Sequence, residues 1–252
     1  MIIFEEMENN MISNISYKLS TFADYSGISY TSANMMKAMQ AFEGLELLPG
    51  VAQEISPDGN ASRRIQLVSA NGALTITVYS TRIDVEITSL EKAGFSDLEK
   101  EKILPDLENI ISSLYEKFNQ IMPIPNRIAW FTSYVYFEID SEKKNKFRET
   151  FIKPTHFYGT NLTDEFMVRY AGREDVRINE LDEKFNIITT ITRWLTDQGT
   201  NMEVDGYKID FDINTWQENK KNRFEKEDIK EFVKKSIEFQ KSLEEDFIDE
   251  FK

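Results

Sequence analysis

The sequence predicts an α+β protein in which a β-α-β-β-β-α series of elements occurs twice. Short stretches of alternating apolar and polar residues are typical of strands, and long stretches with apolar residues three and four positions apart are typical of amphipathic helices. The chain has 252 residues, enough for one large domain or two small ones. We expect two tightly docked halves, residues 11–121 and 127–252, whose antiparallel, curved sheet or sheets wrap the long helices. The halves share their order of elements and no strong residue identity.

The first half is predicted from its periodicity and its turn residues. Residues 12–20 alternate like a strand, Thr31 or Ser32 can cap the next helix, and Asn71-Gly72 is typical of a hairpin turn. Pro105 falls inside the last helical pattern, where we expect a kink. The predicted elements are a strand at 12–20, a helix at 29–44, a turn-rich exposed segment at 47–62, strands near 65–67, 74–79 and 83–87, and a helix at 97–120.

The second half repeats this order. Its first strand, 127–140, is apolar or aromatic on both faces, so we expect it to lie at the centre of a sheet. We expect the last two strands to be joined by a turn at Asp205-Gly206. The remaining predicted elements are a helix at 141–151, strands at 166–170, 185–195 and 203–213, and a closing helix at 225–251.

Missing residue types exclude several chemistries. The chain has one histidine, His156, and no cysteine, which removes cysteine nucleophiles, disulfides and the ligands of structural zinc. No nucleophile elbow surrounds His156, so we predict a loop or packing role for it. Neither of the phosphate-binding patterns GxxxxGKS/T and GxGxxG occurs. We therefore predict no cofactor and, as the leading interpretation, no enzymatic activity.

Acidic residues dominate the charge, with 44 Asp and Glu against 30 Lys and Arg and a formal net charge of −14. Nucleic-acid binding depends on basic residues that displace counterions from phosphates, so this charge argues against a nucleic-acid partner. No apolar run approaches the roughly 20 residues of a membrane helix. The first residues are acidic, unlike the basic start of a signal peptide. We expect a cytoplasmic protein without membrane association.

The closing helix has an unusual distribution of charge. Its first part is rich in lysine, whereas negative charge at its end opposes the helix macrodipole. Two interpretations stay open: a solvated surface, or a docking surface for a basic protein partner. Symmetric self-association through this helix would give a homodimer. The candidate partner-binding residues are Glu244, Glu245, Asp246, Asp249 and Glu250.

Two other sets of residues are candidate sites. Trp130, Tyr134 and Tyr136 share one face of a predicted strand, where they either pack the core or form a ligand cup if no helix covers them. Asp210 and Asp212 alternate on another strand, so both carboxylates could bind a metal ion such as Mg²⁺ in a hydrolase, or both could point at water.

Two polar residues, Ser236 and Gln240, interrupt the apolar stripe of the closing helix. Buried polar groups need hydrogen-bond partners, so these side chains are predicted to face a cavity or a subunit interface. The leading interpretation of the whole chain is a non-enzymatic cytosolic module that binds a protein through its acidic closing helix or an exposed sheet face. A small-molecule module and a metal-dependent hydrolase are the alternatives.

Two segments carry a family resemblance. Arg127-Ile-Ala-Trp-Phe-Thr-Ser-Tyr follows the first long helix, and Tyr207-Lys-Ile-Asp-Phe-Asp-Ile precedes the last. Together with the order of elements, they resemble a sporadically distributed bacterial family of uncharacterised proteins. Trp130 and Phe131 depart from that family's pattern, in which Leu and Arg precede the tyrosine. The resemblance implies a TATA-binding-protein-like or helix-grip architecture and no catalytic residues.

Overall fold

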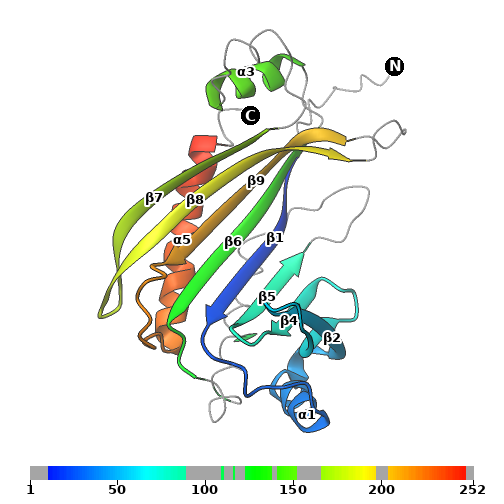
Figure 1. Ribbon diagram of the computed structural model, residues 1–252. Helices are drawn as coiled ribbons and strands as arrows, with labels where there is room; N and C mark the ends of the chain where they lie inside the picture. Colours follow the sequence, from blue (N-terminus) through cyan, green and yellow to red (C-terminus); the bar gives the residue numbers. More distant parts are fainter. Residues whose placement is uncertain are drawn as a thin grey trace, which may run out of the picture.

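The computed structural model describes residues 11–88, 109–110, 116, 123–137, 141–151, 166–196 and 204–247. Its main feature is one antiparallel sheet of nine strands, in the order β2-β3-β4-β5-β1-β6-β9-β8-β7 (Figure 1). The strands are β1 (Met11–Phe22), β2 (Leu47–Ile55), β3 (Ala61–Ser69), β4 (Leu74–Val78), β5 (Arg82–Thr88), β6 (Arg127–Phe137), β7 (Met167–Ile178), β8 (Leu181–Thr196) and β9 (Val204–Thr215). The helices are α1 (Ser32–Ala41), the 3₁₀ turn η1 (Glu43–Leu45), α3 (Ser141–Phe151) and α5 (Lys226–Phe247). The predicted α+β class is confirmed.

The centre of the sheet is the pairing of β1 with β6. It runs from Met11 opposite Phe137 to Phe22 opposite Arg127, with a bulge near Asn14. The last strand of residues 11–88, β5, lies on the outer side of β1, and the last strand of the second half, β9, lies on the outer side of β6. The sheet is therefore continuous from one half of the chain to the other.

One face of the sheet is apolar, and α5 lies against it, behind the strands in Figure 1. Tyr17, Trp130 and Ile213 come from three adjacent central strands, and each is at most 1% exposed. From α5, Phe232 packs its ring 5.2 Å from that of Phe185 on β8. Burying a side chain of this size stabilises the fold by about 1.5–3 kcal/mol. The interface between α5 and the sheet is therefore a main part of the core.

Local sequence signals position α1 and the hairpin between β3 and β4 as expected. The Thr31 hydroxyl accepts a hydrogen bond from the backbone N–H of Asn34 at 3.2 Å and caps α1. Gly72 has a φ of 73° in the turn between β3 and β4, and its N–H donates to the Ser69 carbonyl. This backbone conformation favours glycine because it has no Cβ.

The prediction of a turn-rich segment at 47–62 is wrong. Most of it is β2, an edge strand that pairs with β3, and the turn is confined to residues 56–60. Pro49 and Gly50 lie inside this strand. Because they are typical turn residues, the sequence pattern indicated a turn instead of a strand. Proline is tolerated at a sheet edge because its missing N–H needs no partner there.

The predicted turn at Asp205-Gly206 is also wrong. Both residues lie inside β9, opposite Leu195 and Trp194 of β8. These two strands are longer than their apolar alternation indicated, so the connection between them falls at 197–203, outside the described residues. Of the predicted helix at 97–120, Asn109, Ile110 and Glu116 are described and are helical. Residues 138–140, His156 and residues 248–251 lie outside the described part.

Glu54 joins the edge strand β2 to its neighbours and should make stability depend on pH. Its carboxylate accepts from Arg64 Nε at 2.5 Å and from the Ser80 hydroxyl at 2.7 Å. Burial alone would raise the pKa of Glu54, but the Ser80 hydrogen bonds and the Arg64 charge together lower it below its ordinary value of 4.5. A carboxylate with a lowered pKa stabilises the fold above its ordinary pKa and loses this contribution as the pH falls through the lowered value.

We therefore expect Glu54→Gln to lower the free energy of unfolding at neutral pH and to have a smaller effect at about pH 3. Urea unfolding of both proteins at the two pH values measures the difference. An equal effect at both pH values would contradict the role of the Glu54 charge.

Candidate functional site

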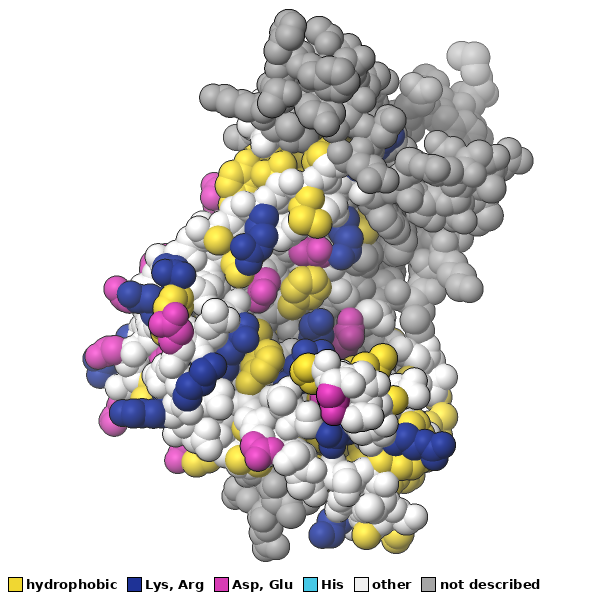
Figure 2. Space-filling model, in the orientation of Figure 1, with side chains coloured by type: hydrophobic (Ala, Val, Ile, Leu, Met, Phe, Trp, Pro, Cys, Tyr) yellow, Lys and Arg dark blue, Asp and Glu magenta, His cyan; other side chains and the backbone are white. Residues whose placement is uncertain are grey.

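The sheet face opposite α5 is polar and forms the candidate site. Figure 2 shows this face, where Lys and Arg side chains are interspersed with acidic and apolar ones. Several of the charges form pairs: Arg64 with Glu54, Arg82 with Asp84, and Lys208 with Asp210. A polar sheet face that no described helix covers is available for binding.

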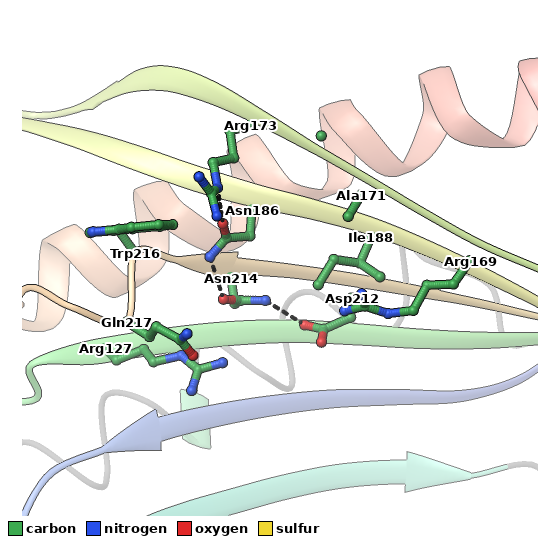
Figure 3. A pocket seen from close by; sticks show the side chains of 11 residues that line it. Arg127, Arg169, Ala171, Arg173, Asn186, Ile188, Asp212, Asn214, Trp216 and Gln217 are labelled. Atoms are coloured by element: carbon green, nitrogen blue, oxygen red, sulfur yellow. Dashed lines mark hydrogen bonds between the residues drawn. The ribbon is translucent and has the colours of Figure 1, made fainter.

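A groove of about 470 Å³ lies on this face, over β7, β8, β9 and the start of β6 (Figure 3). This volume falls within the range of small-ligand sites, which are mostly apolar. Here the lining is mainly polar and includes three arginines. The lining residues are Arg127, Arg169, Ala171, Gly172, Arg173, Asn186, Ile188, Asp212, Asn214, Trp216 and Gln217.

A chain of hydrogen bonds crosses the floor of the groove. Arg173 Nε donates to Asn186 Oδ1 at 3.2 Å, and Asn186 Nδ2 donates to Asn214 Oδ1 at 3.1 Å. Asn214 Nδ2 then donates to Asp212 Oδ1 at 2.9 Å (Figure 3). Strand register explains the row, because Arg173 lies opposite Asn186 and Asn186 lies opposite Asn214. These bonds fix the orientation of the amides and of the Asp212 carboxylate.

Two of the arginines are held against aromatic rings. The Arg173 guanidinium carbon lies 4.2 Å from the centre of the Trp216 ring, and that of Arg127 lies 4.6 Å from the Phe22 ring. Burial lowers the pKa of Arg127, and the charge of Asp212 acts in the opposite direction. Arg127 Nε is buried and has no hydrogen-bond partner within the part of the chain that the structure describes. Leaving a buried donor unpaired costs free energy, so an acceptor that enters the groove and bonds to it would bind more tightly.

The groove is suited to binding a carboxylate or a similar anion. A guanidinium presents planar, paired donors that match the two oxygens of a carboxylate. Among the described lining residues, Asp212 is the single carboxylate, and Asn214 already donates to it. The groove's lining residues could hold and orient an anion, and they include no base paired with a nucleophile.

The three aromatic residues of the predicted ligand cup lie on the opposite face, under α5. Trp130, Tyr134 and Tyr136 are buried. Trp130 Nε1 donates to Gln240 of α5 at 2.9 Å, and the Tyr134 hydroxyl donates to Glu244. Protein side chains thus fill the space beside these rings. Gln240, whose burial the sequence indicated, has a partner within the same chain.

The acidic residues of the closing helix do not form one surface in the described part. Glu244 turns toward the sheet, where it accepts from Tyr134 and from Gln240. Glu245 and Asp246 are exposed. The other two predicted residues, Asp249 and Glu250, lie outside the described residues.

The two aspartates of the predicted metal site lie on the polar sheet face with other partners. Asp210 accepts from the Ser133 hydroxyl at 2.6 Å and pairs with Lys208 at 2.9 Å. Asp212 accepts from Asn214. Within the described ranges, no cluster of three or more His, Asp or Glu residues is arranged to hold a metal ion.

Sequence reasoning named Asp212 and missed the arginines around it. Arg173 lies beyond residue 170, where the predicted strand ended, in the exposed run at 171–175 of the edge strand β7. The alternation of Arg169, Ala171 and Arg173 was the available signal, because alternate residues of a strand share a face.

The fold and the site define an α+β protein with a polar, arginine-lined sheet face opposite its main helix. In the described residues, no helix has the length and apolar character needed to cross a bilayer. No protein-family model and no curated protein sequence matches this chain.

Proposed function

We propose that this protein is a non-enzymatic cytosolic module that binds a protein partner through its polar sheet face. The groove contacts a short acidic segment of that partner. The observation that carries this proposal is the gathering of Arg127, Arg169 and Arg173 around one groove on the face opposite α5.

Charge favours a short acidic segment over a long polyanion. The groove contributes three arginines and one aspartate, whereas the whole chain has a formal net charge of −14. A nucleic acid extends its phosphates well beyond one groove and would meet the surrounding negative charge. A peptide with a few carboxylates can place them on the guanidiniums alone.

The acidic closing helix has less support as the docking surface for a basic partner. Glu244 is committed to Tyr134 and Gln240, so replacing it would disturb the core as well as any partner. Glu245 and Asp246 leave only two exposed carboxylates of this set in the described part. Isolated surface charges contribute little binding energy.

The strand order also supports the proposal that the two halves repeat one winding. From the centre outward, the first half runs β1, β5, β4, β3 and the second runs β6, β9, β8, β7. When β2 is left out of the count, each half places its fourth, third and second strands, in that order, outward from its first. On this interpretation β2 is an addition to the first half, and the helices lie within the curve of the sheet, as in the resembled family.

The test measures binding of a fluorescein-labelled, Glu-rich peptide to the full chain by fluorescence anisotropy. We expect Arg169→Gln combined with Arg173→Gln to weaken binding by about tenfold or more, since a hydrogen bond to a charged group contributes about 1.5–3 kcal/mol. Arg177→Gln is the matched control, because Arg177 lies on the same strand outside the groove and pairs with Asp182 in solvent.

Equal losses in the double variant and in the Arg177→Gln control would contradict a groove-specific site. A single-stranded oligonucleotide that binds more tightly than the peptide at the same salt concentration would contradict the choice of partner.

A further inference from the structure

We propose that the edge strand β2 pairs with β2 of a second copy of this chain, in antiparallel register centred on Gln53. This surface is independent of the groove, because β2 and β7 lie at opposite edges of the sheet. Three features of β2 favour this pairing: the direction of its backbone groups, the position of Pro49, and its exposed side chains.

The hairpin that follows β2 sets the direction of its backbone groups. Ser56 N–H donates to the Asn60 carbonyl at 2.9 Å, which makes 56 and 60 a hydrogen-bonded pair. Hydrogen-bonded and non-hydrogen-bonded pairs alternate along an antiparallel ladder. Residues 54, 52 and 50 therefore bond to β3, whereas Ile55, Gln53 and Val51 direct their N–H and C=O groups away from the sheet. Pro49, without an N–H, falls on the outward side as this pattern requires.

Pro49 also selects the register of a symmetric pair. Centring the two-fold axis on Gln53 places Val51 opposite Ile55 of the second copy and Gln53 opposite its equivalent. Each residue of this pairing has an outward N–H that no described strand of the same chain uses. Centring it on Val51 would place Pro49 opposite Gln53 of the second copy and lose a hydrogen bond in each half. The Gln53 register thus retains all the outward donors.

The side chains of β2 present little of the charge that protects exposed edges. Natural edge strands are commonly blocked by charged side chains or by proline, and β2 has only Pro49, near its start. Glu54 is the single charged residue of β2, and it turns inward to Arg64 and Ser80. Val51 and Ile55 are 48% and 71% exposed, and the register above pairs them with each other.

The opposite edge carries the exposed charge that β2 lacks. β7 carries charged side chains along its exposed length: Arg169, Arg173, Glu174, Asp175 and Arg177. The contrast favours β2 as the pairing edge. Pairing there makes the sheet continuous through both copies and leaves both arginine grooves open.

Paired charges test both the interface and its register. Val51→Lys with Ile55→Lys sets lysine opposite lysine across the two-fold axis, whereas Val51→Lys with Ile55→Glu sets lysine opposite glutamate. Both positions are exposed, so neither change disturbs the core. Gln53→Pro removes the central outward donor and leaves the β2–β3 bonds intact, as Pro49 does.

Analytical ultracentrifugation over a concentration series gives the mass, and circular dichroism confirms the fold of each variant. We expect a dimer for the wild-type chain and for the Lys/Glu variant, and monomers for the Lys/Lys and Gln53→Pro variants. A monomeric wild-type chain overturns the proposal and leaves a foreign extended segment as the occupant of the edge. A dimeric Lys/Lys variant, or a monomeric Lys/Glu variant, overturns the register.

Discussion

Replacing Arg223 with methionine should lower the free energy of unfolding by about 3–5 kcal/mol, because it leaves the buried Glu183 carboxylate without its partner. Arg223 Nε and Nη2 donate to the two Glu183 oxygens at 2.5 and 2.8 Å. The Arg223 and Glu183 side chains are only 10% and 4% exposed. An isolated buried charge is much more costly than a solvated one.

Arg223 also holds the segment between β9 and α5 in place. Its Nη1 donates to the backbone carbonyls of Asn219 at 3.1 Å and Lys221 at 2.9 Å, and to that of Asn126 just before β6. One guanidinium therefore joins β8, the start of β6 and the approach to α5. Loss of these bonds adds to the cost of the unpaired carboxylate.

Urea unfolding of three variants separates these contributions. Arg223→Met combined with Glu183→Leu should recover part of the loss, since no buried charge remains, and the unrecovered part reports the carbonyl contacts. Arg177→Met removes an exposed ion pair with Asp182 and should change stability by at most about 1 kcal/mol. A loss for Arg223→Met no larger than that of Arg177→Met would contradict a structural role for the pair.

The central strands were predictable because they are buried on both faces. On β6, Trp130 faces α5 and Val135 the opposite side, and both are buried. Its sequence therefore has apolar residues on both faces, which is typical of a strand inside a sheet. The edge strands β2 and β7 lack this signal, because an exposed strand has few positions where burial demands an apolar residue.

The groove depends on contacts that no local pattern records. Arg127, Arg173 and Asn214 come from three strands, and strand order and register alone bring them together. A shift of one residue in the register of β8 and β9 would turn Asn186 and Asn214 to the other face and remove them from the groove.

The sequence suggested a role for Asp212 through its spacing from Asp210. Two of their partners, Lys208 and Asn214, lie on the same strand. Ser133, which donates to Asp210, comes from the paired strand β6.

For Gln240, the sequence predicts the need for a hydrogen-bond partner but not which residue the partner is. A glutamine within an apolar helix stripe requires hydrogen-bond partners, and this requirement was readable from the sequence. The identity of one partner, Trp130, was not, because 110 positions separate the two residues. Ser236, one turn earlier, is buried, and its hydroxyl has no hydrogen-bond partner among the described residues, so the same rule fails there.

Replacing Gln240 with alanine should therefore lower the free energy of unfolding by about 2–4 kcal/mol, from an unpaired buried indole N–H and a small cavity. Its amide accepts from Trp130 at 2.9 Å and donates to Tyr134 at 2.5 Å and to Glu244 at 2.7 Å. Gln240→Met fills most of the space and offers no strong acceptor, so most of the loss should persist. Ser236→Ala is the matched control and should leave stability unchanged or raise it, because it removes an unpaired hydroxyl. Urea unfolding measures all three, and wild-type stability in Gln240→Met would assign the role of Gln240 to packing alone.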